Sequence, residues 1–206
     1  ATPHPDWAAA GAVFTTNVAA YEARKLLMLN AAHSMLAYAG LLRGHTFVHE
    51  ASADARLYDQ MEALWYEAAH AIPLALRDTL PDYRRALTDR FRVPQMQHRL
   101  DQIAMDGSLK VAVRLLPILR APWSAGRPCP ATQSAIGAWI AYLWRFSERG
   151  VVAADPRASP LLDKRHDLPF EEFALATLAL LDGPNIGNGP QEHILRAASD
   201  WLDGAT

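Results

Sequence analysis

The sequence predicts an all-α protein, and two observations support this prediction. Of the 206 residues, Ala and Leu together supply 65 whereas Val and Ile supply 15, a balance that favours helices over strands. Several segments also place apolar residues at steps of three and four, which is the spacing of an amphipathic helix. No long linker, internal repeat or low-complexity tract divides the chain, so one helical domain over residues 1–206 is expected.

The predicted elements follow the chain in order, after an N-terminal segment that contains Pro and Gly. Residues 12–18 are β-prone and predict an extended lead-in strand. A helix is expected over residues 20–38, stopped by Gly40. Residues 54–72 place five apolar residues on one helical face, so they predict an amphipathic helix that Pro73 ends or kinks. The five are Leu57, Met61, Leu64, Trp65 and Ala68.

Shorter helices are expected in the middle of the chain. They cover residues 82–92, 95–104 and 109–119, and the turn MDGS separates the second from the third. Ser108 is expected to cap the third helix, and Pro117 to bend it or end it early. The last predicted elements are a buried, aromatic-rich helix at 134–149, an exposed loop at 163–166, and helices at 169–181 and 191–202.

Composition narrows the kinds of partner. The net charge is -2 and no segment gathers Lys or Arg into a stripe, so nucleic acid and anionic membranes are not expected partners. One cysteine, Cys129, excludes an internal disulfide framework and fits a reducing compartment. The longest apolar run, at 173–181, is too short to span a membrane. We therefore expect a cytoplasmic protein that acts on a small molecule or another protein.

The stretch KLLMLNAAHS puts three polar residues into an otherwise apolar helix. On a helical wheel, Lys25, Asn30 and His33 fall within an arc of roughly 140°. The helix is apolar almost all round, so it should be surrounded by protein, and burying an ammonium costs several kcal/mol unless it is paired or discharged. Two readings stay open: a functional cluster, or a lysine that extends to solvent beside a hydrogen-bonded core histidine.

Lysine usage favours the functional reading. The chain has 17 arginines and only three lysines, Lys25, Lys110 and Lys164. A guanidinium stays charged, whereas a desolvated ammonium can lose its proton near neutral pH, so proton transfer is a task for which Arg cannot replace Lys.

Other motifs are weaker. His45 and His49 have a spacing that can hold zinc, but the sequence HTFVHE offers no third ligand, so no metal site is expected. Neither a phosphate-binding GxGxxG after a strand nor a GxSxG motif is present. Lys110, which follows the turn DGS, has an ordinary explanation as a solvated charge.

Three stretches together resemble a known family. KLLMLNAAHSMLAYAG matches every position of the K-x4-N-x2-H signature of the polyol-specific long-chain dehydrogenases, the mannitol dehydrogenase and fructuronate reductase family. RFRVP resembles the family's RFxNP, with Val93 in place of Asn, and HRLDQIAMDGSLKVAVRLLP is similar to a run of the fructuronate reductase branch, with Ala112 in place of Pro. The resemblance is continuous from about Trp7 to Arg120, and ADPRASPLL extends it weakly.

The resemblance implies a multihelical C-terminal substrate domain, similar to that of 6-phosphogluconate dehydrogenase. In the family an N-terminal Rossmann domain binds NAD, and this chain lacks it, so no cofactor-binding residue is expected here. The resemblance assigns Lys25 as general base, Asn30 as hydrogen-bond donor to the reacting oxygen, and His33 as a contact of a substrate hydroxyl. Further substrate-binding candidates are Lys110, Gln102, Arg99 and Arg114.

The implied function is that of an NAD-dependent oxidoreductase that interconverts a keto-uronate or ketose with its aldonate or polyol. Gln102 stands where mannitol-oxidising members usually have Arg, which favours a sugar acid whose carboxylate meets Lys110, Arg99 or Arg114. The resemblance implies no metal, and a fragment that neither turns over nor binds NAD tightly. The alternative is a standalone helical binding or assembly module. An in-frame dinucleotide fold upstream of Ala1 would favour the enzyme.

Overall fold

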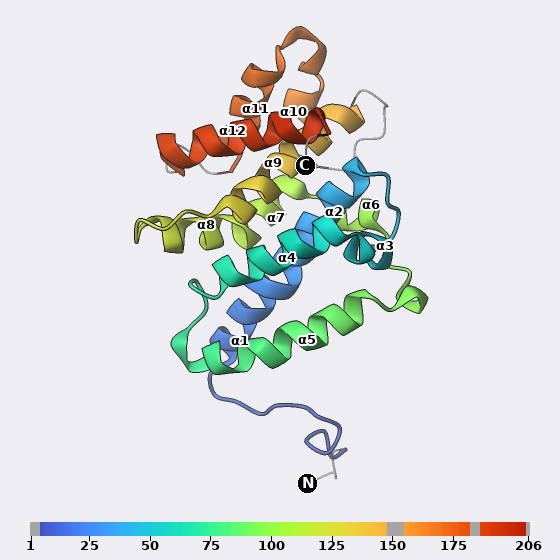
Figure 1. Cartoon of the computed structure of the whole chain (residues 1–206), viewed down its shortest axis with the longest axis vertical. Coiled ribbons are helices and arrows are strands. Elements are labelled where there is room, and N and C mark those ends of the chain that lie inside the picture. Colours follow the sequence, from blue (N-terminus) through green and yellow to red (C-terminus); the bar gives the residue numbers. More distant parts are fainter. Residues whose placement is uncertain (1–4, 148–154, 182–185, 205–206) are drawn as a thin grey trace.

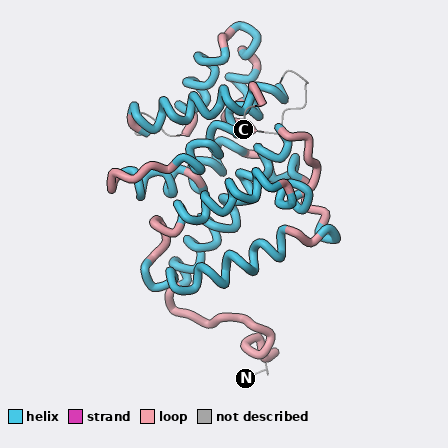
Figure 2. The backbone as a smooth tube through the Cα atoms, in the orientation of Figure 1, coloured by secondary structure: helices cyan, strands magenta, loops and turns pink. Residues whose placement is uncertain are grey.

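The computed structural model describes residues 5–147, 155–181 and 186–204, and the regular structure in these ranges is helical (Figures 1 and 2). One isolated antiparallel bridge joins Phe47 to Arg99. The all-α prediction is therefore confirmed for the part of the chain that is described. None of its helices combines the length and the apolar character that crossing a membrane requires.

The helices differ widely in length. The first eight helical segments are α1 (Val18–Arg24), η1 (Lys25–Asn30), α2 (Ala31–Leu42), α3 (Val48–Ala53), α4 (Ala55–Ala68), η2 (Leu74–Thr79), α5 (Leu80–Phe91) and η3 (Pro94–Met96). They are followed by α6 (Leu100–Ala104), α7 (Gly107–Arg114), α8 (Leu116–Trp123), α9 (Pro130–Ser147), α10 (Ser159–Leu162), η4 (Arg165–Asp167), α11 (Phe170–Ala179) and α12 (Asn188–Leu202).

Helix α2 forms the centre of the core. It is buried on almost every side, and it packs against α9, α6, α4 and α7. Helices α10 to α12 gather with α9 at one end of the molecule, and α1 and α5 lie at the other (Figure 1). The crossing of α9 and α12 is close, because a Cβ atom added at Gly137 would lie 2.8 Å from the backbone nitrogen of Ala198.

The long first helix differs from its prediction at both ends. It starts at Val18 and runs unbroken through α1, η1 and α2 to Leu42, so Gly40 does not stop it. Gly40 serves packing instead: a Cβ atom there would lie 2.7 Å from Cδ1 of Leu100. The helix ends where Gly44 adopts a positive φ of 86°.

The predicted strand at residues 12–18 and the predicted end of α4 are also corrected. Residues 12–18 form no strand: the segment leaves the helices as an irregular, exposed tail (Figure 2), and Val18 already belongs to α1. Helix α4 ends at Ala68 rather than at Pro73, which instead precedes η2. The predicted apolar face of α4 is confirmed, because all five of its residues are buried.

The predicted helix at 95–104 is broken in two. Gln97 has a left-handed backbone with φ of 44°, so η3 ends there and α6 begins only at Leu100. The residues between them pair with the segment before α3: the amide of Val48 donates to the carbonyl of His98, and the amide of Leu100 to that of Thr46. These long-range bonds satisfy backbone groups that a continuous helix would have used internally.

Most of the remaining helix predictions agree with the structure. Helix α5 fits the helix predicted at 82–92, Pro117 lies in the first turn of α8 after a break at Leu115, and α9, α11 and α12 match the last three predicted helices within a few residues. The expected exposed loop at 163–166 is wrong at Arg165, which is buried with its guanidinium 4.0 Å from the ring centroid of Trp144. Residues 148 and 149 of the predicted aromatic-rich helix lie outside the described residues.

Candidate active site

Lys25, Asn30 and His33 lie on the continuous helix made of α1, η1 and α2. Its middle part, η1, is a π-helix, in which the amide of Ala31 donates to the carbonyl of Leu26, five residues earlier. Residues five apart lie near one face of a π-helical turn, whereas in a regular α-helix they are about 140° apart. The π turn therefore brings Lys25 and Asn30 closer to one face than the sequence predicted.

The exposure of Lys25 differs from the expectation of a helix surrounded by protein. Its side chain is exposed, whereas Leu27, Met28 and Leu29, which follow it in η1, are buried. Helices α4 and α7 pack against η1, and the described residues leave Lys25 at the surface. In this chain the ammonium is therefore open to a ligand or to another protein surface.

His33 is half-buried between two other rings. Its ring centroid lies 4.6 Å from that of Phe91 and 6.0 Å from that of His98. Burial, followed by the charges of His98, Arg90 and Arg114, lowers the pKa of His33 to about 4. The imidazole is therefore neutral at pH 7, and its buried Nε2 has no hydrogen-bond partner among the described residues.

Lys110 lies on α7, which packs against η1. Its Nζ donates to the carbonyl of Ile103 at 3.1 Å, so the side chain bends back over α6. Burial and the nearby charge of Arg114 lower the pKa of Lys110. The side chain is half-buried rather than the fully solvated charge of the ordinary reading.

Arg114, one turn further along α7, contacts the helix of Lys25 directly. Its Nη1 donates to the carbonyl of Asn30 at 3.3 Å and to Oγ of Ser34 at 3.1 Å. Burial lowers the pKa of the Arg114 guanidinium. The structure thus brings five predicted site residues onto two adjacent helices: Lys25, Asn30, His33, Lys110 and Arg114.

The other two predicted residues lie at the start of α6. Arg99 is exposed and makes a bidentate ion pair with Asp101, with N to O distances of 3.0 and 2.7 Å. Gln102 is exposed, and its backbone amide donates to Oδ1 of Asp101 at 2.8 Å. Because Asp101 already occupies the guanidinium of Arg99, Lys110 and Arg114 are better placed to meet an anion.

Asp155 is a structural partner of the site that sequence reasoning missed. Its buried carboxylate accepts the backbone amide of Ser108 at 2.7 Å and also the Ser108 hydroxyl. The prediction that Ser108 caps this helix is therefore wrong. Asp155 takes that role from outside and fixes the start of α7, which carries Lys110. The signal was available in ADPRASPLL, the one C-terminal stretch that resembles the family.

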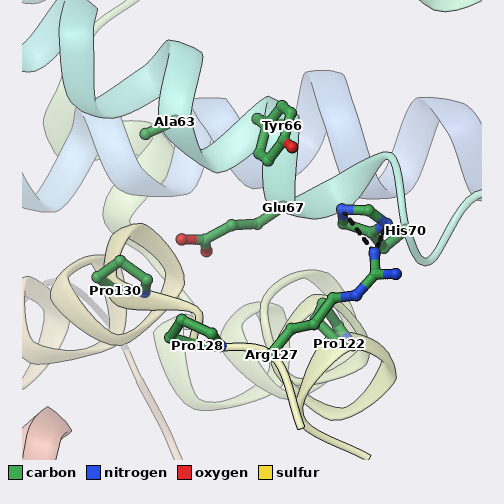
Figure 3. Close-up of a pocket in the computed structure, with 8 residues that line it drawn as sticks. All are labelled: Ala63, Tyr66, Glu67, His70, Pro122, Arg127, Pro128 and Pro130. Atoms are coloured by element: carbon green, nitrogen blue, oxygen red, sulfur yellow. Dashed lines mark hydrogen bonds between the residues drawn. The ribbon is translucent and has the colours of Figure 1, made fainter. Parts of the chain in front are cut away.

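A groove of about 760 Å³ lies elsewhere, between the end of α4 and the loop that precedes α9 (Figure 3). At its edge, Nη1 of Arg127 contacts Nδ1 of His70 at 3.0 Å. The carboxylate of Glu67 accepts the amides of Ala131 and Thr132 at 2.8 Å each, so it caps α9. None of the seven predicted site residues lines this groove.

No group of three or more His, Cys, Asp or Glu side chains in the described ranges has the arrangement of a metal site. Nε2 of His45, which the sequence places near His49, contacts Oδ2 of Asp54 at 3.1 Å. Asp54 also accepts Nε of Arg43 at 2.8 Å and caps α4. This cluster is accounted for by the start of α4.

The described fold is an all-helical domain whose first long helix carries the polar side chains of Lys25, Asn30 and His33. The chain belongs to the mannitol dehydrogenase C-terminal domain family, whose model matches residues 17–173. This match confirms the resemblance seen in the sequence.

Curated relatives and a solved structure agree with the family. The chain is 31% identical over 161 residues to mannitol 2-dehydrogenase from Phaeosphaeria nodorum, and 34% identical over 147 residues to D-mannonate oxidoreductase from Escherichia coli. These alignments cover 77% and 71% of the chain but only 28% and 30% of the relatives. The structure of Pseudomonas fluorescens mannitol 2-dehydrogenase with NAD and D-mannitol matches 98% of the chain and 42% of its own, with a TM-score of 0.80 and 27% identity.

Proposed function

We propose that this chain is the substrate-binding and catalytic domain of an NAD-dependent oxidoreductase that interconverts a keto-uronate or ketose with its aldonate or polyol. The observation that carries the proposal is the π turn of η1, whose geometry favours a common face for Lys25 and Asn30. The relatives support it, because those reported above are named as dehydrogenases or oxidoreductases of polyols and sugar acids.

Lys25 acts as the general base in the proposed reaction. Its amine nitrogen takes the proton of the substrate hydroxyl while the carbon that bears this hydroxyl gives up a hydride, and the reverse reaction returns that proton. Asn30 donates a hydrogen bond to the reacting oxygen and so stabilises the alkoxide charge that develops on it. The exposure of Lys25 supports this role, because the amine is open to a substrate.

His33, Lys110 and Arg114 contact or orient the rest of the substrate. The neutral imidazole of His33 can donate to one hydroxyl and accept from another, and its Nε2 has no partner in the described part of the chain. The charges of Lys110 and Arg114 favour a carboxylate, so we infer a sugar acid rather than mannitol. Gln102, in place of the Arg of mannitol-oxidising members, supports the same inference. Arg99 contributes less because Asp101 holds it.

NAD accepts or supplies the hydride when bound. The described residues include no strand followed by a phosphate-binding turn and helix, so they do not fit a dinucleotide. We infer that an N-terminal Rossmann domain of the same polypeptide holds NAD over the open face of Lys25, that the isolated chain is inactive, and that no metal takes part. The chain covers less than half of its relatives, which leaves room for such a domain. The single cysteine supports a cytoplasmic location.

An exposed apolar stripe supports this arrangement. Leu109 and Val113 lie four residues apart on α7, Met105 lies just before that helix, and the three are 48%, 52% and 39% exposed, respectively. A group of exposed apolar side chains indicates a contact surface. Since Lys110 and Arg114 lie beside it, a domain that covers the stripe would also enclose the substrate.

The proposal is tested by assaying the full-length protein with NADH on fructuronate, tagaturonate, fructose and xylulose, with NADPH as the comparison. We expect the two keto-uronates to be reduced with the highest kcat/KM. Preference for fructose would overturn the sugar-acid inference but keep the enzyme class. No turnover of any of the four by a folded protein would overturn the proposed function.

A further inference from the structure

The π turn that places Lys25 and Asn30 on one face needs support from outside the helix. A π turn holds one residue more than an α turn, so a return to α geometry leaves one carbonyl without an amide of its own helix. An unpaired buried carbonyl costs about 1–3 kcal/mol. A regular α-helix over the same residues would avoid this cost, so something must favour the π geometry.

The side chain of Trp65 gives the π turn a donor from outside the helix. Its indole Nε1, on α4, donates to the carbonyl of Met28 in the middle of η1, at 3.0 Å. Trp65 is 1% exposed and Met28 is fully buried, so water cannot replace this bond. The Trp65 ring also packs near Phe91, with centroids 6.2 Å apart, and Phe91 in turn contacts His33.

We propose that Trp65 is a positioning residue for the reaction: its indole N–H holds the π turn of η1 and thereby sets Lys25 and Asn30 on one face. The inference rests on the proposed function. Trp65 does not touch the substrate in this account, since it lies behind the helix in the core. Removal of its hydrogen bond allows η1 to relax toward α geometry. In a regular α-helix, Lys25 and Asn30 would point in directions about 140° apart.

The test replaces single tryptophans of the full-length enzyme by benzothienylalanine, which keeps the shape of the ring and exchanges the N–H for sulfur. At position 65 we expect kcat to fall by about 10- to 100-fold, because misplacement of a catalytic group by about 1 Å has an effect of this size. KM should change by less than about threefold, because the substrate contacts made by Lys110 remain.

Two matched controls separate positioning from stability. The indole of Trp201 donates to Ser134 on α9, to its carbonyl at 3.0 Å and to its Oγ at 3.1 Å. The indole of Trp139 is buried and has no partner among the described residues. Benzothienylalanine at position 201 should lower the melting temperature about as much as at position 65 with wild-type kcat, and at position 139 it should change neither. An equal loss of kcat at position 201 would overturn the inference.

The failure of this inference can be told from that of the proposed function. If Lys25→Ala abolishes turnover while the variant at position 65 keeps wild-type kcat, only the positioning role is wrong. A crystal structure of the variant at position 65 gives a readout without any assay. We expect the amide of Ala31 to move from the carbonyl of Leu26 to that of Leu27, and an unchanged π turn would overturn the inference.

Discussion

His33 illustrates how burial sets the chemistry of one side chain. Its ring packs at a tilt against Phe91 near His98, and burial is the main cause that lowers its pKa to about 4. The folded protein therefore keeps the imidazole neutral over a pH range in which the unfolded chain protonates it. The sequence identified His33 as polar within an apolar helix, but the rings beside it come from residues 58 and 65 positions later.

A pH dependence of stability follows from His33. The pKa of His33 is lower in the folded than in the unfolded protein. Its contribution to the free energy of unfolding is therefore fully present above about pH 6.5 and is lost as the pH falls toward 4. The loss amounts to about 3 kcal/mol at most. Urea unfolding of wild type and His33→Gln at pH 7 and 4.5 should show a smaller loss in the variant. The same loss in both would contradict this assignment.

Glu67 allows a second test at this scale. Its buried carboxylate accepts the first amides of α9, and Gln keeps the volume but presents one N–H₂ group to these donors. We expect Glu67→Gln to lower the free energy of unfolding by about 1–3 kcal/mol. Exposed Glu22→Gln is the control and should change it by less than about 0.5 kcal/mol. Equal effects of the two substitutions would show that Glu67 does not stabilise α9.

Which site residues the sequence could identify depends on the distance to their partners. Lys25, Asn30 and His33 share one helix, so a short pattern reveals them. The partner of Trp65 lies 37 residues away and that of Ser108 lies 47 residues away, and no local pattern marks such pairs. Arg114 was predicted as a substrate contact, and only the structure reveals its bond to the carbonyl of Asn30.

Among the elements, long periodic helices were predicted well and special backbone geometry was not. The apolar face of α4 matches a regular three-and-four spacing, so its prediction is confirmed. The π turn of η1 adds one residue to a turn without any change in composition, so periodicity does not reveal it. The break at Gln97 depends on pairing with residues near Phe47, which are 50 positions away.

The glycines in helix crossings give a test at this scale. Gly40 and Gly137 both lie inside helices, where Ala has the better intrinsic propensity, by about 1 kcal/mol. We nevertheless expect both Gly→Ala variants to be less stable, because the new methyl group would lie 2.7 Å from Leu100 and 2.8 Å from the backbone of Ala198, respectively.

The order of the two effects is the sharper expectation. The Leu100 side chain can change its rotamer, whereas the backbone of α12 cannot move without displacing the whole helix. Gly137→Ala should therefore lower the melting temperature more than Gly40→Ala, as measured by circular dichroism. The reverse order would show that α12 packs less tightly than the structure indicates.

At the scale of the whole molecule, the site lies on an open surface. The exposed ammonium of Lys25 and the apolar stripe of Met105, Leu109 and Val113 are typical of a face that another domain covers. The sequence predicted a helix surrounded by protein because it is apolar almost all round, and it left open a Lys25 that extends to solvent. A helix is apolar on all sides whether its own chain surrounds it or a separate domain covers one of its faces. The sequence of this chain alone therefore cannot distinguish these two cases.

Labelling of lysines tests this arrangement. We expect an amine-acylating reagent to modify Lys25 quickly in the isolated chain and at least about tenfold more slowly in the full-length protein with NAD, since the proposed cofactor domain would cover it. Lys164, which is exposed and remote from the predicted site residues in the sequence, is the internal control and should react at the same rate in both. Peptide mass spectrometry resolves the two sites easily because the chain has three lysines. Equal rates at Lys25 would contradict the proposed domain contact.

The measurement that tests the central claim most directly is the turnover of Lys25→Ala in the full-length enzyme, with Lys25→Arg as the charge-keeping control. If Lys25 is the general base, kcat falls by about 10²- to 10⁴-fold in both variants, because neither side chain can exchange the proton near neutral pH. KM should stay within a few-fold of the wild-type value. A kcat close to wild type in Lys25→Ala would contradict the account.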